Sequence, residues 1–317
     1  MMVPPVALRR CPSYELDDLN PALDALLADL GGLAAFVKPG QRVLLKPNLI
    51  SDSAPERAAT THPALVEALA RRVMALGAVP FVADAPAWGA PTAVARATGI
   101  LDVCTRLGIE WIGLDQKGWL PSTYPAVARG FHIDPRVLSA DVVINLPKFK
   151  GHQQLGFTGA VKNLYGCLAG REKAYHHCAR SRTDAVFATY LVAYAAAIPV
   201  ALHLCDGVLA MEGAGPRLGQ PRTLGWLAAS TGAVELDAVC ADLVDAPASH
   251  RLILDAALEL GWGETDVARI PLLGDAPDGL RVDDFVWPEL LGVFFSPWRL
   301  ARGWWRNRKL MASEKMV

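Results

Sequence analysis

Short apolar runs bounded by turn residues recur along the chain, with segments of helical character between them. This alternation is typical of a mostly parallel sheet covered by helices, because parallel neighbours need a long connection that is usually a helix. The sequence therefore predicts an α/β fold with a doubly wound, mostly parallel sheet, and it is also compatible with two lobes around a cleft. The expected strands are Val43–Lys46, Val79–Ala83, Glu110–Leu114, Val142–Leu146, Val200–Cys205 and Leu224–Ala229.

One intervening segment shows helical spacing clearly. From Pro63 to Leu76 apolar residues recur every three or four positions, which places them on one face of a helix. Thr61 precedes the segment as an N-cap candidate, and Gly77 follows it as a terminator. We expect this helix to bury its apolar face against the sheet.

The stretch from Ala185 to Cys205 contains no Asp, Glu, Lys or Arg and is long enough to cross a bilayer. Pro199 divides it, and Asp206 and Gly207 end it. A buried helix over Ala185–Ile198 that leads into a buried strand explains this pattern, so we favour it over a membrane span.

Charge and cysteine content limit the class of protein. The 317 residues contain 31 basic and 32 acidic side chains, which gives no overall attraction to nucleic acid or to an anionic membrane. The six cysteines form no CxxC pair, which argues against an iron–sulfur cluster, a zinc ribbon or a secreted disulfide framework. The beginning of the sequence lacks the features of a secretory signal, so we expect a cytoplasmic protein.

The composition changes near the end of the sequence. We expect an α/β domain over residues 1–284, with a lobe division near 155–180 as an option, and a separate Trp- and Arg-rich tail over 285–317. A helix in this tail would place Arg299, Arg302, Arg306 and Lys309 on one face. Such a helix could lie on a membrane surface or contact a partner protein, or it could pack on its own domain.

Polar residues gather where the predicted strands end. Ligands of doubly wound sheets bind beyond the carboxyl ends of the strands. Lys46 and Asn48 follow the first predicted strand, Asp84 the second, and Asp115 the third. The segment Asn145–Lys150 follows the fourth predicted strand, and Asp206 the fifth.

The densest group of polar residues and glycines runs from Asn145 to His177. Gly156 and Gly159 allow tight turns, and the helix expected from Ala160 would present free N–H groups that favour an anion. The segment contains neither a Walker A loop nor a GxGxxG motif, so nucleotide binding is not indicated. Taken singly, these residues also fit a solvated glycine-rich loop. Lys162 is different, because a lysine in an apolar helix start must be paired or desolvated, and a desolvated lysine is a reactive amine.

Two further groups of residues each allow a functional and a structural interpretation. Asp206 and Glu212, in an expected loop with three glycines, could bind a metal or position a base, or could cap a turn and face solvent. His62 could be a ligand, or it could cap the helix that begins at Pro63.

Five motifs carry a resemblance to a known family: KPNL at 46–49, TTHP at 60–63, ADVVINLPKFKGH at 140–152, TGAVKNLYG at 158–166 and DGVLAMEGAGPRLGQP at 206–221. Together they resemble the bacterial and archaeal family called domain of unknown function 362. The resemblance covers roughly residues 43–244 and implies no particular reaction. Many members carry an added ferredoxin-type cysteine cluster that this chain lacks.

The segment from His152 to His177 is also similar to the nickel-pincer 2-hydroxyacid (lactate) racemases. That resemblance implies that Lys162 matches the lysine that holds the pincer cofactor, His152 a catalytic histidine, and His176 or His177 the nickel ligand. The Gly-Thr-His-Arg element of the racemases has no counterpart here, because residues 83–86 read Ala-Asp-Ala-Pro.

We therefore expect an enzyme, isomerase- or racemase-like or an oxidoreductase, that acts on a small anionic, carboxylate-bearing substrate by proton or hydride transfer. A divalent metal, nickel or another, is a cofactor candidate, and no nucleic-acid partner is expected. The alternative is a non-catalytic protein that binds an anionic ligand or a redox partner. The residues assigned to the site are His152, Lys162 and Asp206 as catalytic groups, Lys46, Asn48, Lys148, Lys150, Asn163 and Glu212 as substrate-binding groups, and His176 and His177 as metal ligands.

Overall fold

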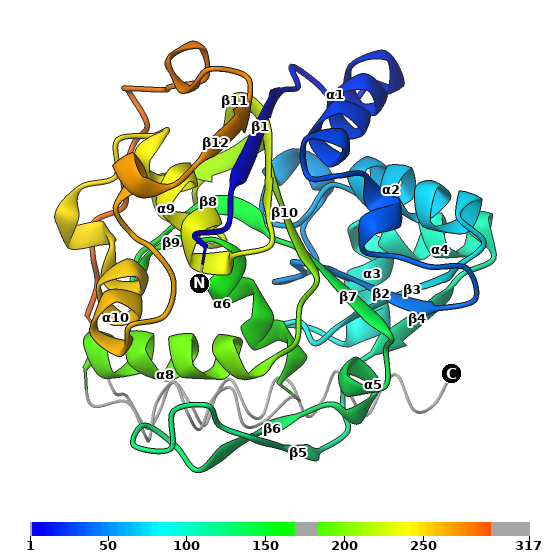
Figure 1. Cartoon of the computed structure of the whole chain (residues 1–317), viewed down its shortest axis with the longest axis horizontal. Coiled ribbons are helices and arrows are strands. Elements are labelled where there is room, and N and C mark those ends of the chain that lie inside the picture. Colours follow the sequence, from blue (N-terminus) through cyan, green and yellow to red (C-terminus); the bar gives the residue numbers. More distant parts are fainter. Residues whose placement is uncertain (1, 169–182, 293–317) are drawn as a thin grey trace.

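A computed structural model of the chain describes residues 2–168 and 183–292. At its centre is a ten-stranded sheet of order β12-β1-β11-β10-β7-β2-β3-β4, and the β8–β9 hairpin is attached beside β10 (Figure 1). Neighbouring strands are parallel from β10 through β7, β2 and β3 to β4, whereas β11 is antiparallel to both β10 and β1. The predicted α/β fold with a mostly parallel sheet is confirmed. The strands are β1 Val6–Arg10, β2 Arg42–Pro47, β3 Val79–Asp84, β4 Glu110–Gly113, β7 Val142–Leu146, β8 Lys148–His152, β9 Gly156–Thr158, β10 Leu202–Glu212, β11 Gln220–Ser230 and β12 Leu272–Gly274.

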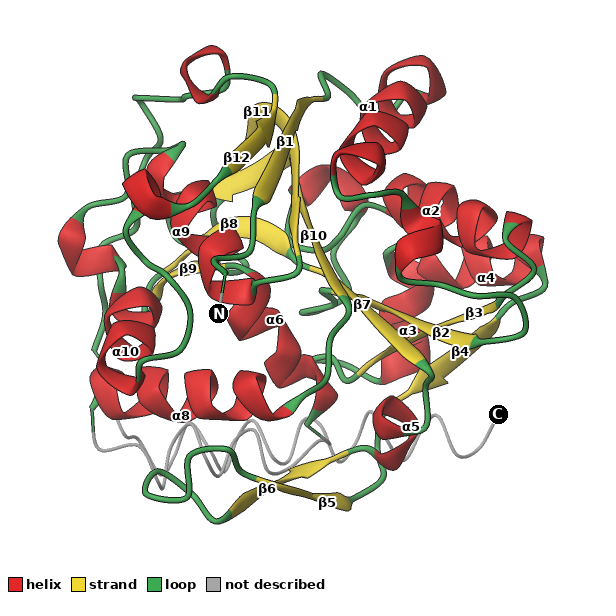
Figure 2. Ribbon diagram, in the orientation of Figure 1, coloured by secondary structure: helices red, strands yellow, loops and turns green. Residues whose placement is uncertain are grey.

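Helices cover both faces of this sheet (Figure 2). One apolar cluster joins α1, α2, α3 and α4 to one face, and a second cluster joins α6, α8, α9 and α10 to the other. Along β2, Val43 and Leu45 belong to the first cluster and Leu44 to the second, as side-chain alternation requires. Burial of both faces explains the uninterrupted apolar runs in the sequence. The helices are α1 Leu16–Asp29, α2 Pro63–Ala75, α3 Pro91–Ala97, α4 Ile100–Leu107, α5 Pro135–Leu138, α6 Ala160–Asn163, α8 Asp184–Ala197, α9 Ala233–Asp242 and α10 Leu252–Leu260. A separate two-stranded sheet contains β5 Gly118–Pro121 and β6 Gly130–Ile133.

All six predicted strands are present, but β10 and β11 are longer than predicted. Strand β10 continues past Cys205 to Glu212, because it forms a long antiparallel ladder with β11 that is interrupted between Gly207 and Leu209. Asp206 and Glu212 therefore belong to a strand, and the prediction that they lie in a loop is wrong. The segment after β7 is also a strand, β8, which pairs with β10 and β9.

The start of α2 shows which of the two roles considered for His62 it has in the fold. The ring of His62 is the N-cap, and its Nδ1 accepts a hydrogen bond from the Ala64 N–H at 3.3 Å. The prediction that Thr61 caps this helix is wrong, because the Thr61 hydroxyl instead accepts from the Asn48 N–H and donates to the Leu146 carbonyl. Gly77 ends the helix with a φ of 74°.

The uncharged run forms α8 followed by β10, as predicted. Phe187, Leu191 and Tyr194 of α8 are buried against α10 and the rest of the core. Within residues 2–168 and 183–292, no helix is both long enough and apolar enough to cross a membrane.

The first residues of the predicted tail pack on the domain. Phe285 is buried, with its ring centroid 6.0 Å from that of Phe149, and the Leu291 N–H donates to the Gln153 carbonyl at 2.6 Å. The Trp- and Arg-rich residues 293–317 lie outside the described residues. The division of the chain at residue 285 thus stays a prediction.

Candidate functional site

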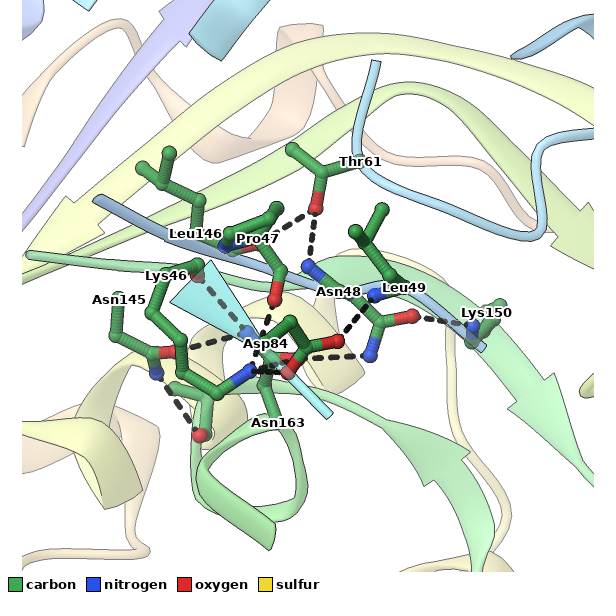
Figure 3. Close-up of polar contacts among 11 residues, drawn as sticks. Lys46, Pro47, Asn48, Leu49, Thr61, Asp84, Asn145, Leu146, Lys150 and Asn163 are labelled. Carbon is green, nitrogen blue, oxygen red and sulfur yellow. Dashed lines mark hydrogen bonds and ion pairs between the residues drawn. The ribbon is translucent and has the colours of Figure 1, made fainter. Parts of the chain in front are cut away.

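A buried ion pair lies at the carboxyl ends of β2 and β3. The Lys46 Nζ is 2.8 Å from the Asp84 Oδ1, and both side chains are excluded from solvent. The second carboxylate oxygen of Asp84 accepts from the Leu49 N–H at 3.0 Å, and the Lys46 Nζ also donates to the Pro47 carbonyl (Figure 3). Adjacent parallel strands bring these two residues together from 38 positions apart in sequence.

Backbone at Gly166 covers this ion pair. A Cβ at Gly166 would overlap the Asp84 carboxylate and the Lys46 ammonium, so only glycine allows such close approach. The Gly166 carbonyl accepts from the Ala85 N–H at 3.1 Å, which holds the turn after α6 over the end of β3. The Lys46–Asp84 ion pair therefore packs directly against the turn at Gly166.

Three asparagine side chains link the ion pair to the strand ends around it. The Asn163 amide donates to the Asn145 Oδ1 at 2.8 Å and accepts from the Asn48 Nδ2 at 2.8 Å (Figure 3). The Asn145 Nδ2 lies 3.0 Å from the His203 Nδ1. Burial lowers the pKa of His203 to about 3, so its ring is neutral and its Nδ1 accepts this bond. The row runs from β10 through β7 and α6 to the loop after β2.

Lys150 lies at the other end of this row of hydrogen bonds, next to Asn48. Its amine donates to the Asn48 Oδ1 at 2.6 Å and to the Ala59 carbonyl, and its side chain is fully buried. Among the described residues no carboxylate forms an ion pair with it. Burial is the main cause that holds the pKa of Lys150 well below its usual value, and the neighbouring Lys162 and Lys148 lower it further.

A second buried ion pair lies beside the first. The Lys148 Nζ is 2.9 Å from the Asp206 Oδ2, and both side chains are excluded from solvent. The Tyr14 hydroxyl donates to the Asp206 Oδ1 at 2.6 Å and accepts from Lys148 at 2.7 Å. Burial lowers the pKa of Lys148 although Asp206 opposes this, and burial together with Asp206 raises the pKa of Tyr14.

The loop 59–62 connects Lys150 and Asn48 to the Lys148–Asp206 ion pair. Ala59 accepts from Lys150, Thr61 bonds the backbone of Asn48 and Leu146, and the His62 N–H donates to the Asp206 Oδ2 at 2.9 Å. The His62 ring stacks on Tyr14 with centroids 3.6 Å apart, and burial lowers its pKa to about 4. His62 is therefore a neutral capping residue in this structure.

The helix start at Ala160 already holds an anion from within the protein. The carboxylate of Asp237, on α9, accepts from the Ala160 N–H and from the Val161 N–H at 3.0 Å. A Cβ at Gly159 would overlap this carboxylate. The free N–H groups that the sequence predicts for binding an external anion are thus occupied. Burial raises the pKa of Asp237 to about 7, against the effect of the two N–H donors.

The predicted catalytic residues have different surroundings. Lys162 is only half-buried, so Lys150 rather than Lys162 is the desolvated amine. His152 is buried, and its Nδ1 accepts from the N–H groups of Gln154 and Leu155 at 3.2 Å each, which places the ring proton on Nε2. Asp206 is engaged by Lys148, Tyr14 and His62. The convergence of His152, Lys162 and Asp206 on one ligand stays a prediction.

Glu212 lies apart from the two ion pairs. Its Oε2 accepts from the Val286 N–H at 3.0 Å, so it holds the segment after residue 284 against the end of β10. The structure gives this side chain a packing role, and its assignment to substrate binding stays a prediction.

The described residues do not present a metal site. Within 2–168 and 183–292, no group of three or more His, Cys, Asp and Glu side chains converges. Both oxygens of Asp206 are already hydrogen-bonded, and binding a metal there would break its ion pair with Lys148. His176 and His177, the predicted ligands, lie outside the described residues.

The structure thus brings Lys46, Asn48, Lys150 and Asn163 into one network and places Lys148 with Asp206 beside it. The sequence-based assignment missed other members of these networks. Asp84 and Asn145 carried a signal, because Asp84 directly follows one predicted strand and Asn145 lies at the last but one position of another. The others carried little signal, because they contact the site across large sequence separations; they are Tyr14, His203 and Asp237.

Two comparisons of sequence give consistent results. The family described as domain of unknown function 362 matches residues 43–242. A protein of Synechocystis sp. named thylakoid-associated protein sll1697 is 39% identical over 290 residues, a match that covers 92% of this chain and 89% of that protein.

Comparison with solved structures shows more distant similarity. A lactate racemase apoprotein from Thermoanaerobacterium thermosaccharolyticum aligns with a TM-score of 0.42 and 15% identity, over 65% of this chain and 51% of that one. A protein from Thermotoga maritima aligns with a TM-score of 0.37 and 13% identity, over 64% and 52% of the two chains. This chain thus spans about half the length of each structure, and similarity at this level assigns no activity.

Proposed function

Because this chain belongs to the domain of unknown function 362 family, whose name specifies no reaction, we propose its function from the site: an enzyme that transfers a proton on a small, carboxylate-bearing substrate. In this proposal the Lys150 amine is the acid–base group and Lys162 binds the carboxylate. The two buried ion pairs hold the surrounding strand ends in place.

The observation that carries the proposal is the incomplete bonding of Lys150. A neutral amine has two N–H donors and one lone pair, whereas an ammonium has three donors. Asn48 and Ala59 supply two acceptors, and no third acceptor is present among the described residues. The neutral form therefore keeps a lone pair for a proton, and the charged form needs one more oxygen, which a substrate carboxylate would supply.

The charges around Lys150 support an anionic ligand. Lys46 and Lys148 are each paired with a carboxylate, whereas Lys150 lies near Lys162, which would repel a protonated Lys150 electrostatically. A bound carboxylate would relieve this repulsion and raise the pKa of Lys150. The same cations would stabilise negative charge that develops on the substrate during proton removal.

The proposed step balances without another reactant. The lone pair of the Lys150 Nζ takes the proton from the carbon next to the substrate carboxylate, and the electron pair of the broken C–H bond is delocalised into that carboxylate. Return of a proton to the opposite face of this carbon would invert it, and return elsewhere would isomerise the molecule. His152, with its proton on Nε2, is the candidate for that second transfer.

Hydrogen exchange tests this proposal directly. The protein would be incubated in D2O with a panel of small 2-hydroxy, 2-amino and unsubstituted carboxylates, and loss of the Cα–H signal would be followed by NMR. We expect exchange for at least one compound, and loss of this exchange in Lys150→Met. Lys38→Met is the matched control, because Lys38 is exposed and precedes β2 at the opposite end of the strand from Lys46.

Anion binding without exchange would instead favour the alternative, a non-catalytic protein that binds an anionic ligand or a redox partner. The predicted cofactor, a divalent metal such as nickel or a group attached to Lys162, has a separate test. Intact-mass spectrometry and metal analysis of protein purified from its native host would detect either one.

We also propose that the protein associates peripherally with a membrane through residues 293–317. The related Synechocystis protein is named as thylakoid-associated, and the sequence of this segment combines Trp with Arg. Removal of residues 293–317 should reduce co-sedimentation with anionic liposomes. Unchanged co-sedimentation would contradict this part of the proposal.

A further inference from the structure

An arginine at the edge of the site has no anionic partner. The guanidinium carbon of Arg217 lies 5.0 Å from the centroid of the Trp88 ring, in a cation–π contact. Within the described residues Arg217 forms no ion pair, and its Nε is buried without a hydrogen-bond partner. Trp88 holds the guanidinium in position but provides no acceptor for its N–H groups.

Backbone contacts place Arg217 and Trp88 beside the proposed substrate. Trp88, in the loop after β3, donates its N–H to the Ile50 carbonyl at 3.0 Å, and Ile50 is two residues after Asn48. Arg217 lies in the connection between β10 and β11. This connection is held by the Gln153 N–H, which donates to the Gly215 carbonyl at 3.1 Å.

The connection also touches the residue that follows Lys150. A Cβ at Gly215 would overlap the Gly151 carbonyl, so glycine allows the two backbones to meet. The Arg217–Trp88 pair therefore lies at the same edge of the sheet as Asn48 and Lys150.

A small apolar cluster contacts both Lys150 and Trp88. It consists of Ile50, Ala58, Ala59 and Met211. Met211 is the β10 neighbour of Lys150, the Ala59 carbonyl accepts from Lys150, and the Ile50 carbonyl accepts from Trp88. Buried apolar side chains thus connect Lys150 with the Arg217–Trp88 pair.

We propose that Arg217 binds a second carboxylate, so that the substrate class is a small dicarboxylate with a short apolar spacer. This inference rests on the proposed function, which places the first carboxylate at Lys150 and Lys162. The planar guanidinium suits a carboxylate because two parallel N–H groups can bind its two oxygens. Binding would also give the buried Nε of Arg217 the acceptor that it lacks.

The test compares two ligands of similar size. Succinate and butyrate would be titrated into the full-length protein by calorimetry at constant ionic strength. We expect succinate to bind about 10- to 100-fold more tightly than butyrate, since the difference is one charge-assisted interaction. Arg217→Gln should remove this preference and leave butyrate binding unchanged. Arg217→Lys should restore only part of it, because an ammonium lacks the planar fork.

Two further variants separate this inference from the proposed function. Trp88→Leu should weaken succinate binding by roughly two- to fivefold, since only the support of Arg217 is lost. Arg96→Gln, at an exposed position on α3, is the matched control and should change nothing. A succinate preference that survives Arg217→Gln would overturn the inference alone. Unchanged binding of both ligands by Lys150→Met would instead overturn the proposed function.

Discussion

The Nζ of Lys150 donates to the Oδ1 of Asn48 at 2.6 Å and thereby begins a directed row of hydrogen bonds that ends at the neutral ring of His203. Each asparagine in the row accepts through its oxygen and donates through its nitrogen, so the amide dipoles point the same way. The orientation of every amide follows from the lysine at one end.

Breaking the row in the middle should destabilise the fold. Asn163→Leu leaves the Asn48 Nδ2 and the Asn145 Oδ1 without their partner, at a cost of about 1–3 kcal/mol for each buried group. We expect a loss of roughly 2–5 kcal/mol in urea unfolding. Asn20→Ala is the control, since Asn20 is only half-buried and bonds the exposed side of α2. Equal losses of unfolding free energy in Asn163→Leu and Asn20→Ala would contradict the stabilising role of the asparagine row.

Removal of the charge should destabilise the protein more at Lys46 than at Lys150. Lys46→Met leaves the Asp84 carboxylate buried and unpaired, so we expect a loss of about 3–5 kcal/mol. Lys150→Met removes an amine that has no carboxylate partner among the described residues and leaves the Asn48 Oδ1 and the Ala59 carbonyl without this donor, so we expect a smaller loss, about 1–3 kcal/mol. Equilibrium unfolding of both variants measures this difference. A large loss in Lys150→Met would show that its charge is compensated.

Two glycines near the site should not tolerate a methyl group. Gly159→Ala would push into the Asp237 carboxylate, and Gly166→Ala into the Lys46–Asp84 pair. We expect each to cost about 1–3 kcal/mol, since the side-chain atoms that the added Cβ would meet are buried and held by hydrogen bonds or an ion pair, and must shift. Gly279→Ala is the control, because its added Cβ would meet only the flexible end of Arg10. Melting temperatures of the three variants provide the comparison.

The raised pKa of Asp237 predicts a pH-dependent stability. Burial raises the pKa of the folded carboxyl to about 7, whereas the pKa of an unfolded aspartate is near 3.8. As the pH rises between these values, the unfolded chain releases the proton and the folded chain retains it, so stability falls and then levels off above pH 7. This contribution is at most about 4 kcal/mol. The difference in unfolding free energy between the protein and Asp237→Asn should follow this curve. A difference that does not vary from pH 4 to pH 8 would contradict it.

The sheet could be predicted from the sequence because its strands are buried on both faces. Val43, Leu44 and Leu45 read as one apolar run for this reason. The carboxyl-end rule likewise predicted that Lys46, Asn48 and Asp84 lie in one region, where they are now found. Strand β8 was not predicted, because Lys148 and Lys150 alternate with Phe149 and Gly151 and look like a solvated loop. In the fold, Asp206 and Tyr14 bond the Lys148 amine, and Asn48 and the Ala59 carbonyl bond the Lys150 amine.

Contacts between distant residues could not be read from the sequence. The carboxylate of Asp237 reaches Ala160 across 77 residues, and the Tyr14 hydroxyl reaches Asp206 across 192. Neither Asp237 nor Tyr14 stands in a motif or at a predicted strand end. The N–H groups at the helix start at Ala160, which the sequence predicted to be free, are therefore bonded by Asp237. The desolvated amine is Lys150 rather than Lys162.

The titration of Lys150 tests the central claim most directly. In protein labelled with 13C at lysine Cε, the Lys150 signal would be assigned as the one missing from Lys150→Met. The account predicts a pKa well below the usual 10.5 in the free protein, and a clear rise when succinate is bound. A Lys150 that titrates at or above 10.5, with no response to succinate, would contradict the account.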